Sequence, residues 1–287
     1  MIKLLASDLD GTLFYPKDHL HAVPKNNREF LRSLSERKID ILYVSGRNPK
    51  VLPYLEKITH KAYPLLGCNG AYLYQGGRID ERRPMDSDKL IDLVEKLRPR
   101  KDIYAYFFFD VTTRLHLIFE NLSAFSRISL LLSNQLNGAY RESVIHGYHK
   151  AMDWVRNNPI DKLMIVFGLG NEGRKRALQS FTEVSKLAGD SFSVVVSGTS
   201  LEIMKKGVDK GSGLVRYCQE RGIQKDEVLV CGDSGNDIAM LSLFPFSFAM
   251  SHATKMVKEK ASFVIDSVCD LKDWLTEENE FRIPEKG

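Results

Sequence analysis

Acidic, hydroxyl and glycine residues follow directly after three short apolar runs of the sequence. Asp8–Thr12 follows the first run, Ser45–Arg47 the second, and Gly232–Asp237 a third run late in the chain. In an open parallel sheet, ligands bind at the carboxyl ends of the strands. If the three runs are neighbouring strands, these segments meet in one crevice. The sequence therefore predicts a site made of carboxylates, a hydroxyl and flexible backbone.

The Asp8-x-Asp10 pair in this site is crowded and like-charged. Such a pair is costly unless a cation or a proton relieves the repulsion. Mg²⁺ prefers hard carboxylate oxygens and keeps water or substrate phosphate as its remaining ligands. Asp233 would supply a third protein ligand. We therefore expect a divalent metal site at Asp8, Asp10 and Asp233.

Phosphate-binding groups are expected beside these acids. The Ser45 hydroxyl and the Gly46 amide are donors suited to a phosphate oxygen. Lys210 lies where a helix begins, and a lysine reaching into a carboxylate cluster would neutralise phosphate and keep a nucleophilic carboxylate ionised. Taken alone, Ser45–Arg47 is also typical of a strand-ending turn, and Lys210 of a solvated helix start.

Strands and helices alternate at both ends of the chain, as such a crevice requires. The expected elements are strands at 2–6, 39–44, 228–231 and 262–265, and helices at 24–37, 48–58, 211–221, 236–243 and 271–275. This alternation predicts an α/β fold, a doubly wound parallel sheet with helices on both faces.

The middle of the chain has a different pattern. The expected elements there are helices at 86–97, 122–136 and 171–187, and strands at 103–109, 113–119, 163–167, 193–197 and 201–204. Hairpins with helices on one side predict an α+β domain inserted into the first one. We expect a discontinuous catalytic core at 1–82 and 205–287, and an inserted domain at 83–204.

Four segments together resemble, in order, the signature motifs of the haloacid dehalogenase (HAD) superfamily. They are Asp8-x-Asp10-Gly11-Thr12, Ser45, Lys210 and Gly232-Asp233-x-x-Asn236-Asp237. The insertion between the second and third motifs is similar in position and size to the type IIB cap of the Cof-like phosphatases. Cys68–Ala71 is similar to the Asn-Gly-Ala segment of those proteins.

This resemblance implies a Rossmann-like HAD core and a role for each matching residue. Asp8 would be the nucleophile that forms an aspartyl-phosphate, and Asp10 would protonate the leaving alcohol and then activate water. Mg²⁺ would be held by Asp8, Asp233 and the Asp10 backbone carbonyl, with Asp237 supporting them. The residues expected to hold the phosphate are Leu9, Thr12, Ser45, Gly46, Lys210 and Asn236. Asn69 and Gly70 are expected on the substrate side of the site.

Two segments depart from the family pattern. Met250–Ala253 stands where relatives often have Gly-Asn-Ala, and residues 266–270 lack the glycine found in the matching late segment. These differences concern loops beside the substrate and leave the chemical residues unchanged.

A magnesium-dependent phosphatase of small phosphorylated metabolites, sugar phosphates foremost, is the function that the resemblance implies. A phosphomutase of the same superfamily is an alternative, and an inactive binding relative is another. A response-regulator phospho-acceptor domain also uses an acidic pair, a hydroxyl and a lysine at strand ends. It needs only about 120 residues and places its acceptor after a middle strand. Here Asp8 follows the first strand.

Composition narrows the setting. The 41 basic and 37 acidic residues are spread along the chain, and no basic block indicates a nucleic-acid partner. Apolar runs are too short to span a bilayer, and the N-terminus meets Asp8 too early for a secretory signal. The four cysteines are widely spaced, which disfavours zinc or disulfides and favours a cytoplasmic location. We expect a monomer or small homo-oligomer.

Two further groups of residues receive structural interpretations. The aromatic run at 104–109 is expected to pack under the helices of the inserted domain. His146, His149 and Asp153 are expected in a solvated loop, because no second group of metal ligands follows them.

Overall fold

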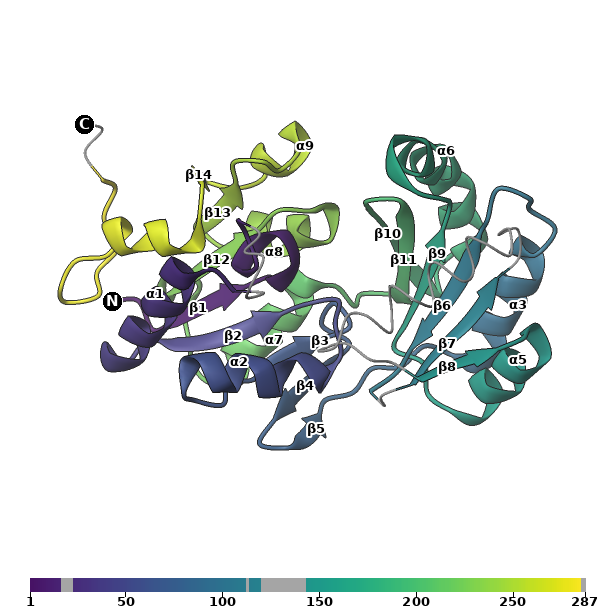
Figure 1. Cartoon of the computed structure of the whole chain (residues 1–287), viewed down its shortest axis with the longest axis horizontal. Helices are drawn as coiled ribbons and strands as arrows, with labels where there is room; N and C mark the ends of the chain where they lie inside the picture. The colour runs from purple at the N-terminus through teal and green to yellow at the C-terminus, as the bar shows by residue number, and fades with distance from the viewer. Residues whose placement is uncertain (17–22, 112–113, 120–142, 285–287) are drawn as a thin grey trace. The chain divides into compact units, whose positions relative to one another are not determined.

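The computed structural model describes residues 1–16, 23–111, 114–119 and 143–284. The chain folds into two compact units. Unit 1 comprises Met1–Gly46, Leu52–Asp80 and Lys210–Gly287, and unit 2 comprises Arg47–Val51 and Glu81–Asp209. Both the purple N-terminal part and the yellow C-terminal part of the chain in Figure 1 belong to unit 1.

Unit 1 is built on an eight-stranded sheet in the order β14-β13-β12-β1-β2-β3-β4-β5. The strands are β1 (Leu4–Ser7), β2 (Asp40–Val44), β3 (Leu65–Gly67), β4 (Tyr72–Gln75), β5 (Arg78–Asp80), β12 (Val228–Gly232), β13 (Phe246–Met250) and β14 (Phe263–Ile265). Pairing is parallel from β14 to β3, and β4 and β5 continue the sheet in antiparallel pairs. The strand β1 lies between β2 and β12, with Ser7 level with Tyr43 on one side and with Cys231 on the other.

Helices cover both faces of this sheet. The helices are α1 (Lys25–Glu36), α2 (Leu52–Thr59), α7 (Lys210–Glu220), α8 (Ile238–Leu243) and α9 (Lys255–Lys258), with short helical turns at Leu9–Leu13, Lys225–Glu227, Gly235–Asp237 and Val268–Trp274. One face packs in a single core with α7, α8 and α9 through Leu42 and Val44 of β2. Because side chains alternate along a strand, Ile41 and Tyr43 face the other side, where α1 contacts β2 and α2.

The predicted fold class is confirmed. The prediction of individual elements was incomplete, mainly toward the two edges of the sheet. The strands β3, β4, β5 and β13 and the helix α9 were not expected from the sequence. The sheet therefore has more strands than predicted, and the antiparallel β4–β5 hairpin makes it a mixed sheet at one edge.

Unit 2 contains a six-stranded sheet in the order β10-β11-β9-β6-β7-β8. The strands are β6 (Ala105–Phe109), β7 (Arg114–Phe119), β8 (Ser143–His146), β9 (Lys162–Val166), β10 (Phe192–Ser197) and β11 (Ser200–Lys205), and the helices are α3 (Ser87–Leu97), α5 (Tyr148–Asn157) and α6 (Gly170–Ala188). A short 3₁₀ turn at Pro49–Val51 is also assigned to this unit. These three helices of the described residues share one core with alternate residues of the sheet, among them Tyr106 and Phe108 of β6.

The other interpretations for the middle of the chain have mixed outcomes. Tyr106 and Phe108 pack against the helices as expected, whereas Ala105 and Phe107 form a small cluster of their own. The prediction of a loop around His149 is wrong, because His149 lies on the helix α5. The helix expected at 122–136 lies outside the described residues. Among the helices that the structure does describe, none is long and apolar enough to cross a membrane.

Candidate active site

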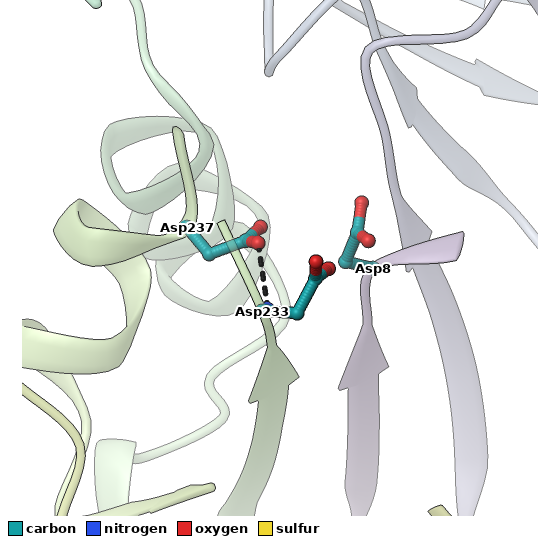
Figure 2. A group of neighbouring side chains, drawn as sticks. All are labelled: Asp8, Asp233 and Asp237. Carbon is teal, nitrogen blue, oxygen red and sulfur yellow. Dashed lines mark hydrogen bonds between the residues drawn. The ribbon is translucent and has the colours of Figure 1, made fainter. Parts of the chain in front are cut away.

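The end of the central strand β1 positions Asp8. The Asp8 amide donates to the Cys231 carbonyl at 3.0 Å, which continues the ladder between β1 and β12 by one residue. Asp233 follows the end of β12. The carboxylates of Asp8 and Asp233 therefore lie side by side at the carboxyl edge of the sheet, as Figure 2 shows. Asp8 is buried, with 4% of its surface exposed.

The loop after Asp8 packs tightly against Asp233. Gly11 has a φ of 81°, and a Cβ atom at this position would lie 2.4 Å from Asp233 Oδ2. Only glycine therefore fits here, both for its left-handed backbone and for the space. The Thr12 hydroxyl donates to Asp233 Oδ1 at 2.9 Å. Asp10 lies in the same loop and is exposed.

Lys210, the first residue of α7, lies beneath the acids with 1% of its surface exposed. Its ammonium group donates to Asp8 Oδ1 at 2.5 Å and to Asp237 Oδ1 at 2.7 Å. Burial alone would lower the pKa of Lys210, but the neighbouring Asp237 and Asp8 outweigh it and raise that pKa above its usual value. The lysine therefore stays charged and pairs with the predicted nucleophile.

Asp237 ties the loop after β12 together. Its Oδ2 accepts from the Asp233 amide at 3.0 Å, the bond drawn in Figure 2, and from the Ser234 amide at 2.9 Å. Its other oxygen accepts from Lys210. Both oxygens are thus engaged by the protein, so Asp237 orients its neighbours.

Oxygens of Asp8, Asp233 and Asp237 lie within 4.8 Å of one another, close enough to share a metal ion. Burial raises the pKa of Asp8 well above its usual range; Lys210 opposes this shift, and the charges of Asp237 and Asp233 add to it. Burial, with the charge of Asp237, also raises the pKa of Asp233 to about 6. The single charge of Lys210 therefore does not offset the negative charge of the three carboxylates. An all-carboxylate donor set of this kind fits Mg²⁺.

A second group of predicted residues is joined by hydrogen bonds beside the acids. Ser45 follows β2 and is 1% exposed. Its amide donates to the Leu66 carbonyl at 3.0 Å, and its carbonyl accepts from the Asn69 amide at 2.9 Å. The side-chain amide of Asn236 donates to Asn69 Oδ1 at 3.3 Å. The structure thus connects the loops of Ser45, Asn69 and Asn236.

The other predicted residues differ in their burial and in their hydrogen-bond partners. The Leu9 side chain is fully buried, so only its backbone could meet a phosphate. Thr12 is also fully buried, and its hydroxyl is directed to Asp233 instead of to a phosphate. Gly46 is half-buried beside Ser45. Asn69 is fully buried, and Gly70 accepts a hydrogen bond from Arg216 at 3.0 Å.

Sequence reasoning missed an aromatic pair at the edge of the acid cluster. The rings of Tyr15 and His252 lie 3.9 Å apart between centroids, and His252 Nε2 is 3.9 Å from Asp233 Oδ2. His252 belongs to Met250–Ala253, one of the two segments that depart from the family pattern. This departure from the family pattern is the sequence feature that could have drawn attention to His252 and its partner Tyr15.

The family model of the haloacid dehalogenase-like hydrolases matches residues 5–272. A phosphoglycolate phosphatase of Thermoplasma volcanium is 27% identical, with 92% of each chain covered. The Escherichia coli 5-amino-6-(5-phospho-D-ribitylamino)uracil phosphatase YbjI is 25% identical over 91% of this chain and 90% of that one.

Solved structures share the fold. The subclass IIB sugar phosphatase BT4131 superposes with a TM-score of 0.74 at 18% sequence identity, covering 94% of this chain and 98% of that one. The resemblance inferred from the four motifs is confirmed by these matches.

Proposed function

Because the chain belongs to the haloacid dehalogenase-like hydrolases, we propose that it is a magnesium-dependent phosphatase of small phosphorylated metabolites, sugar phosphates foremost. Asp8 is the proposed nucleophile, and the reaction proceeds through an aspartyl-phosphate on its carboxylate. The family match over residues 5–272 also argues against a response-regulator phospho-acceptor domain, which is a different fold family.

One observation carries the proposal: a buried carboxylate at the end of the central strand is paired with a buried lysine. Lys210 Nζ lies 2.5 Å from Asp8 Oδ1, and Asp233 stands beside them. A structural ion pair would not need two further carboxylates within 4.8 Å, because each adds repulsion. Such an arrangement suits a nucleophile that must stay ionised and meet an anionic phosphate.

In the first step, a carboxylate oxygen of Asp8 attacks phosphorus, and the bond from phosphorus to the alcohol oxygen breaks. Asp10 gives its proton to that oxygen, so the alcohol leaves neutral. In the second step, Asp10 takes a proton from water, which attacks phosphorus and releases inorganic phosphate and the free Asp8. The exposure of Asp10 supports this role, since a general acid must reach the leaving group.

Asp8, Asp233 and the Asp10 backbone carbonyl would hold Mg²⁺, with Asp237 orienting them. The ion would offset negative charge on the transferring phosphoryl group. Ser45, Gly46, Lys210 and Asn236 would hold phosphate oxygens through N–H and O–H donors. We assign Thr12 a different role from the one expected, since its hydroxyl fixes the orientation of Asp233.

Unit 2 is proposed to select the substrate, since the residues assigned to the chemistry all belong to unit 1. The relatives act, by name, on phosphoglycolate and on a phosphorylated ribitylaminouracil. Small phosphorylated metabolites are therefore the proposed substrate class, and the cytoplasm the proposed location.

A phosphate-release screen over a panel of phosphorylated metabolites tests the proposal. We expect release that stops with chelator and returns with Mg²⁺, while Ca²⁺ substitutes poorly because its looser coordination disturbs in-line attack. Full activity in excess chelator would refute the metal requirement. Formation of an isomerised sugar phosphate instead of free phosphate would identify a phosphomutase.

A further inference from the structure

The turn after β3 has a backbone conformation that residues with a side chain rarely adopt. Cys68, Asn69 and Gly70 have φ values of 46°, 58° and 88° in succession. A left-handed conformation costs about 1–2 kcal/mol for an ordinary residue, less for asparagine and little for glycine. Such strain persists only where the surrounding structure fixes it, and it is enriched at functional sites.

This turn touches each neighbour that carries a phosphate-binding group. The Asn69 amide donates to the Ser45 carbonyl at 2.9 Å. The Gly70 carbonyl accepts from Arg216 of α7, the helix that begins at Lys210. A Cβ atom at Gly213 of the same helix would lie 3.0 Å from the Gly70 Cα. The turn is thus packed between the loop after β2 and the helix α7.

The Asn69 side chain adds the third connection. It is fully buried, and its Oδ1 accepts from Asn236 Nδ2 at 3.3 Å. Asn236 in turn accepts from the Ser234 hydroxyl through Oδ1 at 2.6 Å. These two contacts fix which way the Asn236 amide is turned, because its oxygen meets a donor and its nitrogen meets an acceptor.

We propose that Asn69 is a positioning residue, whose buried side-chain oxygen orients the Asn236 amide toward the substrate phosphate. The inference rests on the proposed function, in which Asn236 holds a phosphate oxygen. Asn69 itself does not touch the substrate, since its surface is fully buried. Asparagine suits the position for two reasons. It tolerates the left-handed backbone, and its side chain is long enough to bring an acceptor oxygen to Asn236.

The variant Asn69→Gly separates the side chain from the backbone. Glycine accepts the φ of 58° without strain and keeps the hydrogen bond from the residue 69 amide to the Ser45 carbonyl. The substitution therefore removes the side chain, and with it the acceptor for Asn236, while the backbone contact remains. We expect KM for p-nitrophenyl phosphate, and the inhibition constant of inorganic phosphate, to rise about tenfold. The kcat should change by less than about threefold, because ground-state and transition-state phosphate binding are lost together.

A double-mutant cycle with Asn236→Ala distinguishes positioning from a general structural role. If Asn69 acts through Asn236, adding Asn69→Gly to Asn236→Ala should change KM by less than about twofold, because the group being oriented is gone. A loss of KM that multiplies fully in the double variant would overturn the proposal.

Asn279 provides a matched control. It also has a left-handed φ of 63°, and its side chain donates to the Arg37 carbonyl at 2.9 Å and accepts from Arg37 Nε at 2.7 Å. Asn279→Gly should lower the thermal stability while KM stays at the wild-type value.

The outcomes separate the inference from the proposed function. If the wild-type protein shows no Mg²⁺-dependent phosphate release, the proposed function fails and the role of Asn69 fails with it. If the wild type and Asn279→Gly are active and Asn69→Gly keeps the wild-type KM, the inference alone is wrong. Should Asn69→Gly not fold, Asn69→Ser replaces it, since serine fills part of the space but is too short to reach Asn236. The same rise in KM is expected, and a wild-type KM would refute the inference.

Discussion

Replacing Lys210 by methionine removes the cation that Asp8 and Asp237 share. Only 1% of the lysine is exposed, and methionine, which has a similar length and no charge, fills this buried space. The carboxylates of Asp8 and Asp237 then lose the ammonium group that lies 2.5 and 2.7 Å from them. Removing one member of a buried ion pair costs about 3–5 kcal/mol. At roughly 2–4 °C per kcal/mol for a domain of this size, the Tm of the metal-free protein should fall by about 10 °C.

The loss should depend on pH in a definite direction. The pKa of Asp8 is raised by burial and by its acidic neighbours, and Lys210 holds that rise in check. An acid whose pKa is higher in the folded state than in the unfolded state binds more protons when folded, so stability falls as pH rises between the two values. Without Lys210 the pKa of Asp8 rises further. The Tm loss should therefore be larger at pH 8 than at pH 5, where protons replace the missing charge.

Thermal unfolding followed by circular dichroism, in chelator at pH 5 and pH 8, measures this effect. A Mg²⁺ titration at pH 8, after the chelator is removed, should show binding at least as tight as in the wild type, because at this pH the ionised cluster has become more negative. The control is Lys162→Met, which removes another buried lysine, 3% exposed and 3.2 Å from Glu202 in unit 2. It should lose stability but keep the wild-type Mg²⁺ affinity. A Tm loss that is absent at pH 8, or equal at both pH values, would refute the electrostatic reasoning.

Three further substitutions test other parts of the molecule. Asp8→Asn should abolish phosphate release, because an amide cannot accept the phosphoryl group, yet raise the metal-free Tm, because burial and the neighbouring acids disfavour the ionised Asp8 by more than Lys210 favours it; a folded variant with wild-type turnover would contradict this. Gly11→Ala places a Cβ 2.4 Å from Asp233 Oδ2, and calorimetry should show Mg²⁺ affinity at least about tenfold weaker, an unchanged affinity being the adverse result. Arg82→Met leaves Asp161 buried without its arginine, 2.9 Å away, and should cost about 3 kcal/mol. Burial already raises the pKa of Asp161 to about 6 against the opposing effect of Arg82. The Tm loss of Arg82→Met should therefore be greater at pH 8 than at pH 5, and equal losses at the two pH values would contradict this reasoning.

The neighbouring positions of Asp8 and Asp233 were predictable because the relevant strands are short apolar runs that end abruptly in polar residues. The rule that parallel strands present their carboxyl ends at one edge then brings distant segments together. The contact between Thr12 and Asp233 was not predictable in this way, since it joins residues 221 positions apart in the chain. No periodicity encodes a side-chain partner at that distance, and the same holds for His252.

The missed elements have local causes. In β13, Phe246–Met250 continues an apolar stretch from α8 across Pro245, so helix and strand patterns could not be separated there. The strand β3 has three residues, fewer than any periodic pattern needs. The helix α5 has Ala151, Met152 and Val155 on its buried face, but the loop was expected from the polar residues His149 and Asp153 without regard to this apolar spacing.

The position of β1 between β2 and β12 has a consequence during synthesis on the ribosome. The partner β2 emerges soon after β1, whereas β12, which pairs with Leu4–Ser7 through Val228–Cys231, is made much later. At about 5–20 residues per second, the delay is on the order of tens of seconds. Throughout this interval the nascent chain carries an apolar central strand with one unpaired edge, which is a template for association with other chains. The acid cluster forms only when β12 closes that edge, so catalytic competence and protection from aggregation arise in the same event.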